Sequence, residues 1–98
     1  MKIEIKKFGT LLTSRPAGKE ALFAFEPYLR NISEDEEILI DFTGAMTISP
    51  GWADEFLTPL AKRYGDRFKL MDSDNSSVVA TIETLEEANN FKFNRVKK

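Results

Sequence analysis

The segment EILIDF, from Glu37 to Phe42, constrains the fold of this chain more than any other stretch. It is a nearly continuous apolar run of strand length, with little alternation between apolar and polar residues. Such a run is typical of a strand that is covered on both faces, as the strands of parallel sheets are. The segment therefore predicts a central strand in a parallel sheet.

A helix is predicted before this strand, from Ala17 to about Asn31, because apolar residues recur there at helical spacing. Ser14 precedes Arg15-Pro16, and a serine in front of such a proline suits the N-cap of a helix. Pro27 removes a backbone donor inside the helix, so we expect a kink there or a break into two short helices. The apolar stripe consists of Ala21, Leu22, Phe25, Tyr28, Leu29 and Ile32.

A second helix is predicted after the strand, where apolar residues recur at the same spacing up to Tyr64. Ser49-Pro50 is a helix-start signature, since the hydroxyl can accept an amide hydrogen bond and proline prefers the first helical position. Gly65 is well placed to stop the helix, and Pro59 implies a local distortion. This stripe consists of Trp52, Ala53, Phe56, Leu57, Leu60, Ala61 and Tyr64.

Shorter patterns complete an alternation of strands and helices along the chain. This order builds right-handed crossovers, so we predict an α/β fold with a mostly parallel or mixed sheet of about four or five strands and about three helices. The 98 residues suit one domain, residues 1–98, with one core. The other expected elements are an edge strand at 2–6 that ends at Gly9, a second arm at 11–12, strands at 67–71 and 91–96, a capping turn at 72–77 and a helix at 78–88.

The composition closes most routes to catalysis. The chain has no cysteine and no histidine, so it lacks disulfides, thiolates, the usual general base near neutral pH and the commonest metal ligand. We therefore expect no enzyme activity and no cofactor. Residues from about Lys92 onward are basic, but the net charge is −2 and no basic face is apparent. We interpret this tail as a solvated terminus and expect no nucleic-acid binding.

The first residues, MKIEIKKFG, alternate apolar and charged side chains. This pattern differs from the uninterrupted apolar run of a signal peptide, and no later window approaches membrane-spanning length. We therefore expect a cytoplasmic protein without membrane contact.

Three aspartates follow the predicted strands. Asp41 ends one strand, and Asp72 and Asp74 come just after the next. The carboxyl ends of parallel strands face the ligand side of such sheets, so these carboxylates could hold Mg²⁺ or accept a phosphoryl group. The interpretation that we favour is structural, because aspartates after strands commonly accept backbone amides in turns.

Ser49 has three possible roles. As a helix cap it contributes about 1 kcal/mol to stability. As a nucleophile it lacks a histidine base, and no Ser-x-x-Lys motif or Gly-x-Ser-x-Gly elbow surrounds it. As a phosphorylation site it would gain from the free amides at a helix N-terminus, whereas the nearby charges of Asp54 and Glu55 would oppose the phosphate. The same two acidic residues also fit a structural role near the positive end of the helix dipole.

Trp52 lies in the first turn of the second helix, beside Gly51, which leaves the backbone open to close approach. Tryptophan is among the residues that most often anchor protein interfaces. Its position on the apolar stripe favours the core, so both interpretations stay open here.

The stretch from Ile38 to Leu57 resembles the STAS-like domain family, small relatives of bacterial anti-sigma-factor antagonists, many of them of uncharacterised function. The resemblance rests on the order of features. These are a buried strand ending in Asp41-Phe42, a turn at Thr43-Gly44, Ile48-Ser49, the aromatic Trp52, and Ala53-Asp54-Glu55 ahead of the apolar helix. Upstream, Gly9 followed by Thr13-Ser14-Arg15 and a helix is similar too.

This resemblance implies a sheet with helices packed against it, no intrinsic catalysis, and function by docking to a protein partner. In the antagonists, the partner is a serine kinase and anti-sigma factor with a histidine-kinase-like ATPase fold. Their switch is a phosphorylated serine that follows an aspartate at the start of this helix. Here Ser49-Pro50 stands where that pattern has Asp-Ser, so Pro50 occupies the acceptor position, and Ser49 and Thr47 lie close enough to substitute for it.

We therefore expect a bacterial regulatory module that binds its partner through the loop and helix start at residues 43–57. The alternative is a small-ligand or nucleotide sensor at the strand ends around Asp41, Asp72 and Asp74. The residues expected to contact the partner are Thr47, Ser49, Gly51, Trp52, Asp54 and Glu55.

Overall fold

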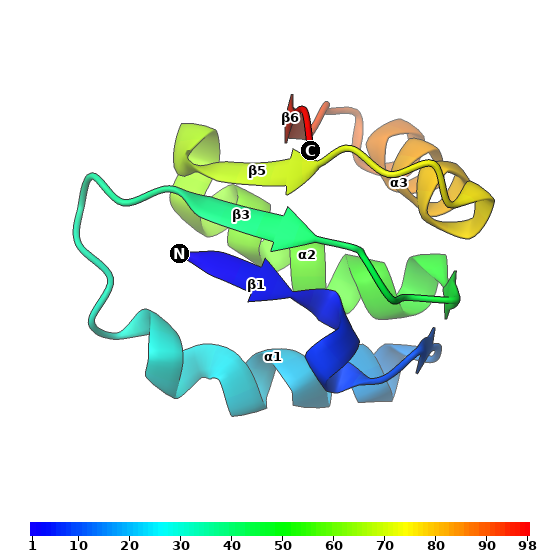
Figure 1. Cartoon of the computed structure of the whole chain (residues 1–98), viewed down its shortest axis with the longest axis horizontal. Helices are drawn as coiled ribbons and strands as arrows, with labels where there is room; N and C mark the ends of the chain where they lie inside the picture. Colours follow the sequence, from blue (N-terminus) through cyan, green and yellow to red (C-terminus); the bar gives the residue numbers. More distant parts are fainter.

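A computed structural model of the protein describes residues 1–98 and confirms the predicted α/β fold (Figure 1). β3 (Ile38–Asp41) lies between β1 (Lys2–Glu4) and β5 (Phe68–Met71), and β6 (Asn94–Val96) pairs with the other side of β5. All neighbouring strands in this four-stranded sheet are parallel. The apolar run at residues 37–42 therefore forms a central parallel strand, as its sequence predicts.

A second, two-stranded sheet lies beside the carboxyl ends of the main strands (Figure 1). It consists of β2 (Leu11–Leu12) and β4 (Thr47–Ile48), which pair in parallel. The segment at 11–12, expected as a second arm of the first strand, is thus a strand of a separate small sheet. Two short 3-10 turns, η1 (Ile5–Phe8) and η2 (Gly65–Arg67), lead out of β1 and into β5.

Three helices complete the fold: α1 (Arg15–Leu29), α2 (Pro50–Tyr64) and α3 (Ser76–Asn89). α1 continues through Pro27 and α2 through Pro59. Of the two outcomes expected at Pro27, a kink or a break into two helices, the break is therefore wrong. Apolar side chains before and after each proline are buried in the core, and this packing on both sides keeps each helix in one piece.

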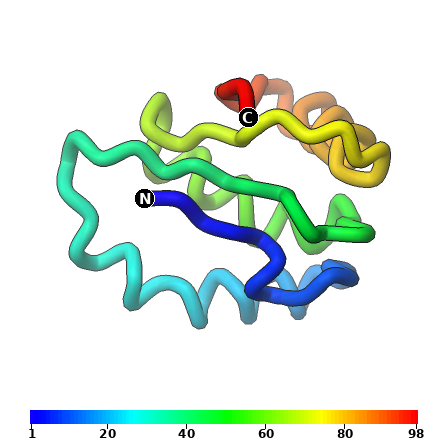
Figure 2. The backbone as a smooth tube through the Cα atoms, in the orientation of Figure 1, coloured from blue at the N-terminus to red at the C-terminus, as the bar shows by residue number.

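The helices cover only one face of the main sheet. α2 lies behind the strands in Figures 1 and 2. Ile3, Ile40 and Leu70 lie side by side in register and are all buried. Leu39 and Lys69 form the next row, point to the opposite face and are partly exposed. The expectation that the central strand is covered on both faces is therefore wrong, because no helix lies over the second face.

The core contains an aromatic cluster between α1, α2 and η1. The rings of Trp52 and Phe56 stack with centroids 5.1 Å apart, and Phe8 and Phe25 pack around Phe56 at 5.0 and 6.4 Å. Tyr28 belongs to the same helical stripe in the sequence, but its side chain is largely exposed. The stripe on α1 is therefore narrower than its spacing suggests.

The basic segment from about Lys92 is part of the fold. Residues 94–96 form β6, and Phe93 is buried in the core. Arg95 pairs with Glu86 of α3, and Lys98 pairs with Asp41. The strand expected at 91–96 is confirmed over residues 94–96, and the interpretation of the segment as a solvated tail is wrong, because strand pairing and ion pairs hold it against β5 and α3. No helix of the chain is long and apolar enough to cross a membrane.

Candidate functional site

The candidate site is the end of the molecule where the main strands point, around the 43–49 loop that joins β3 to α2 (Figure 1). Hydrogen bonds from both sides fix this loop. The side-chain amide of Asn75 donates to the carbonyls of Ala45 at 2.9 Å and Met46 at 3.3 Å. On the other side, the backbone amide of Ser49 donates to the carbonyl of Leu12 at 2.9 Å.

The backbone of Ile48, within β4, forms hydrogen bonds with two side chains of α3. Its amide donates to the hydroxyl of Ser77 at 3.0 Å, and its carbonyl accepts from the hydroxyl of Thr81 at 2.7 Å. The loop is therefore attached to β2 on one side and to the start of α3 on the other. These hydrogen bonds on both sides fix the backbone of the 43–49 loop.

Asp41 lies at the base of the loop and has a structural role. Its carboxylate accepts hydrogen bonds from the amide of Thr43 at 3.0 Å and from the hydroxyl of Thr43 at 2.7 Å. Lys2 and Lys98 lie 3.5 and 3.6 Å from its oxygens. The hydrogen bonds from Thr43 are the main reason why the pKa of Asp41 falls from 3.8 to about 2. This geometry confirms the interpretation of Asp41 as a turn residue.

Asp72 and Asp74 are exposed and lie on the neighbouring loop. They line an open hollow between residues 43–45 and 72–75, together with Lys98. Asp41 is buried and does not line this hollow. No group of three acidic residues in the chain is arranged to hold a metal ion. The three carboxylates that follow the strands therefore do not converge on one ligand.

Ser49 caps α2, as predicted. Its hydroxyl accepts a hydrogen bond from the amide of Trp52 at 3.2 Å. Trp52 itself is only 2% exposed and stacks in the core, so it is not available to anchor a partner at the surface. Thr47 is exposed on β4.

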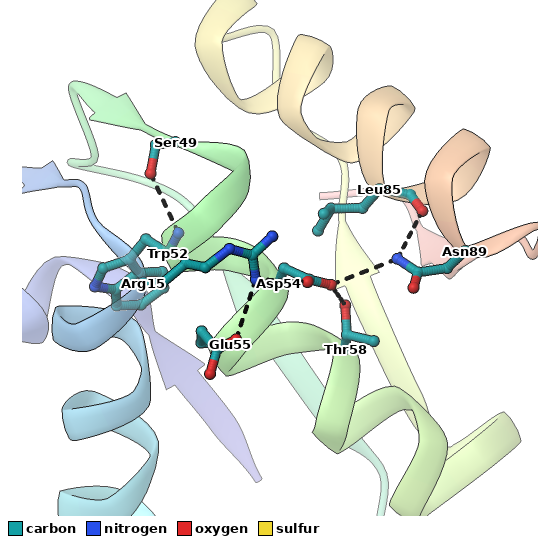
Figure 3. Close-up of polar contacts among 8 residues, drawn as sticks. All are labelled: Arg15, Ser49, Trp52, Asp54, Glu55, Thr58, Leu85 and Asn89. Atoms are coloured by element: carbon teal, nitrogen blue, oxygen red, sulfur yellow. Dashed lines mark hydrogen bonds and ion pairs between the residues drawn. The ribbon is translucent and has the colours of Figure 1, made fainter.

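Asp54 and Glu55 both accept hydrogen bonds from Arg15, another residue of the domain (Figure 3). The guanidinium of Arg15 donates to Asp54 at 2.8 Å and to Glu55 at 3.1 Å, and so connects the start of α1 to α2. The hydroxyl of Thr58 also donates to Asp54 at 2.8 Å. Chiefly because of the Arg15 hydrogen bond, the pKa of Asp54 is lowered. The long side chain of Arg15 also packs over Gly51.

The sequence patterns did not identify Arg15 as a residue of the site. No local motif indicates that it binds acidic side chains of a helix almost forty residues further along the chain. They also missed two exposed apolar side chains, Leu11 and Met46, each of them 67% exposed. Their backbones adjoin, because the amide of Met46 donates to the carbonyl of Thr10 at 2.9 Å. These side chains lie at the same end of the molecule as the 43–49 loop.

A small parallel sheet with helices on one face, and a loop held in place where it leads into α2, is consistent with a STAS-like domain. The family model for a STAS-like domain of unknown function (DUF4325) matches residues 18–78, more than half of the chain. The chain belongs to this family. The matched region contains β3, the 43–49 loop, α2 and β5, and it leaves out β1, β2, β6 and most of α3. No curated protein and no solved structure matches the sequence.

Proposed function

We propose that this domain is a non-catalytic regulatory module that binds a protein partner through the loop and helix start at residues 43–57. The observation that carries the proposal is the exposure of Leu11 and Met46 at this end of the molecule. Exposed apolar side chains that adjoin one another and are rimmed by polar residues are a feature of protein-binding surfaces. By resemblance, the partner is a histidine-kinase-like ATPase or an anti-sigma factor.

The rigidity of the loop supports this proposal. Asn75 and Ser77 hold the loop from α3, and β2 holds it from the other side. A surface that is already ordered loses little conformational freedom when a partner binds, so more of the contact energy appears as affinity. The exposed residues of this loop, which are available for contact, are Thr43, Gly44, Met46 and Thr47.

The polar groups of the site support a role without catalysis. The hydroxyl of Ser49 already accepts a helix amide, and the carboxylate of Asp41 already accepts two hydrogen bonds from Thr43. Asp54 is bound by Arg15 and Thr58. Each of these groups acts within the fold, and none has a histidine beside it to serve as a base.

The proposal is tested with a partner captured from the native organism on the tagged domain, followed by affinity measurements on single variants. Met46→Asp places a charge at the centre of the proposed surface. Because hot-spot side chains contribute about 2 kcal/mol or more, we expect its affinity to fall by at least tenfold. Phe23→Asp is the matched control, since Phe23 is 81% exposed on α1 and lies outside residues 43–57. Equal affinities for the wild type and Met46→Asp would move the interface elsewhere.

The same capture tests the phosphoswitch at Ser49 or Thr47. The mass of the peptide from Thr47 to Trp52 would show an added phosphate if either residue is modified. An unmodified peptide from the bound domain would favour a docking module that is controlled in another way.

A second candidate function is a small-ligand sensor at the hollow between residues 43–45 and 72–75. Two exposed carboxylates, Asp72 and Asp74, line it, with Lys98 as the counter-charge. The carboxylates oppose phosphate groups, so a cationic ligand suits this hollow better than a nucleotide does. A thermal-shift screen of amines and nucleotides tests it, because a ligand at 100 times its dissociation constant adds about 2.7 kcal/mol to stability. No shift with either class would remove this candidate.

A further inference from the structure

Glu86 of α3 is the most deeply buried acidic side chain outside the candidate site, with 5% of the side chain exposed. All its partners come from one short segment. One carboxylate oxygen accepts the backbone amide of Phe93 at 2.9 Å, and the other lies 2.9 Å from the guanidinium of Arg95 and 3.8 Å from the ammonium of Lys92. A buried carboxylate with such partners is costly to leave unpaired, so it strongly favours the docked position of this segment.

The segment at residues 91–98, which contains β6, is otherwise held by the pairing of β6 with β5, by the packing of Phe91 and Phe93, and by the ion pair of Lys98 with Asp41. β6 is a three-residue strand at the edge of the sheet, and Phe93 is the one buried residue of the segment. Short edge strands with exposed backbone hydrogen bonds open at lower free energy than the core. The edge position and short length of β6 therefore favour local opening of this segment before the core opens.

The docked segment contacts the 72–75 loop and Asp41, at the base of the 43–49 loop. The carbonyl of Val96 accepts the amide of Asp72 at 2.9 Å, at the start of the 72–75 loop. That loop ends in Asn75, whose side chain holds the 43–49 loop. Lys98 lines the hollow between the two loops, 3.6 Å from the carboxylate of Asp41. The position of β6 is thus linked through a short series of contacts to the loop that we propose as a docking surface.

We propose that residues 91–98 form a latch: when docked on Glu86, the segment holds the 72–75 and 43–49 loops in place, and when released it loosens both. The consequence for partner binding rests on the proposed function of the 43–49 loop. The latch itself does not rest on that function, because opening of the segment is measurable in the domain without a partner. Its release changes contacts with α3 and β5. Glu86 and the segment itself lie outside residues 18–78, the part of the chain that matches the family.

Hydrogen exchange of the full chain, followed by NMR, tests the latch without any partner. Glu86→Gln keeps the shape of the side chain and removes the charge that holds Arg95. The control is Glu83→Gln, the same change one turn earlier on α3, where the side chain is exposed. Two protons are followed, the backbone amide of Asp72, which reports docking of β6, and the side-chain amide of Asn75, which reports the 43–49 loop.

For Glu86→Gln we expect both protons to exchange about tenfold faster or more, the effect of losing one charged hydrogen bond. Glu83→Gln is expected to match the wild type. Unchanged exchange of Asp72 in Glu86→Gln would show that Glu86 does not hold the segment. Faster exchange of Asp72 alone would show that the strand frays without affecting the loop. Either result overturns the latch. If Glu86→Gln fails to fold, Arg95→Gln removes the same ion pair from its exposed partner and is read in the same way.

Discussion

Replacing Gly18 by alanine tests how closely α1 and α2 pack. A Cβ at Gly18 would lie 2.4 Å from the carbonyl oxygen of Trp52 and 2.9 Å from its Cα, which are backbone atoms that cannot move without moving the helix. Helix propensity alone would make this substitution stabilising by about 1 kcal/mol. Overpacking of a buried contact costs about 1–3 kcal/mol, and so short a contact with backbone belongs at or beyond the upper end. We therefore expect a net loss of about 2 kcal/mol.

Urea unfolding followed by the fluorescence of Trp52, the one tryptophan of the chain, measures this loss directly. With a slope of about 1–2 kcal/mol per molar urea, the midpoint should fall by about 1–2 M. Gly51→Ala is the matched control, because a Cβ there would meet no backbone atom closer than 3.6 Å, and its 3.0 Å contact with the side-chain Cγ of Arg15 is relieved by a shift of a few tenths of an ångström. We expect its unfolding free energy to stay within about 0.5 kcal/mol of the wild type. A Gly18→Ala variant as stable as the wild type would refute the close packing of the two helices.

Two further predictions concern the polar groups at the candidate site. Ser49→Ala removes the cap of α2 and should lower the unfolding free energy by about 1 kcal/mol in the same urea assay; an unchanged value would mean that the hydroxyl does not cap the helix. The lowered pKa of Asp41, about 2 against an ordinary 3.8, adds stability that is fully present above about pH 4 and is lost as the pH falls towards 2. Urea titrations from pH 5 to pH 2 should therefore show a loss of about 2 kcal/mol that is missing in Asp41→Asn, and parallel curves for the two proteins would contradict this account.

The features that could be predicted from the sequence are those set by local interactions. The stripe of α2, the cap at Ser49 and the stop at Gly65 all depend on residues within one or two turns, and the structure confirms each of them. Gly65 has a positive φ of 57°, which glycine adopts without strain, and its amide donates to the carbonyl of Ala61. The central strand was also predictable, because a short continuous apolar run of that length is typical of a buried strand.

The features that could not be predicted depend on how distant elements meet. Arg15 binds Asp54 and Glu55 only because α1 packs alongside α2, and neither helix contains a signal for that register. The exposure of Tyr28 likewise follows from which side of α1 meets α2. Pro27 was overvalued as a helix breaker, because intrinsic preference is a weak guide where packing on both sides holds a helix together.

The candidate site shows the same division. Asp41 was correctly interpreted as a turn residue from its place after a strand, since its partner Thr43 is two residues away. Its ion pair with Lys98 depends on the pairing of β6 with β5. The sequence alone did not decide whether residues 91–98 form a strand or a solvated tail. Leu11 lies in β2 and Met46 directly precedes β4, so the exposure of both side chains follows from the pairing of β2 with β4.

Site-specific photocrosslinking in native cells tests the proposed docking surface most directly. A photoreactive phenylalanine analogue is placed at Met46 in one variant and at Phe23 in another, because both side chains are strongly exposed and only Met46 lies in the 43–57 region. We predict a covalent adduct with one protein partner from position 46 and none with that partner from position 23. An adduct from position 23 alone, or none from position 46 in cells where the domain is bound, would contradict docking through this loop.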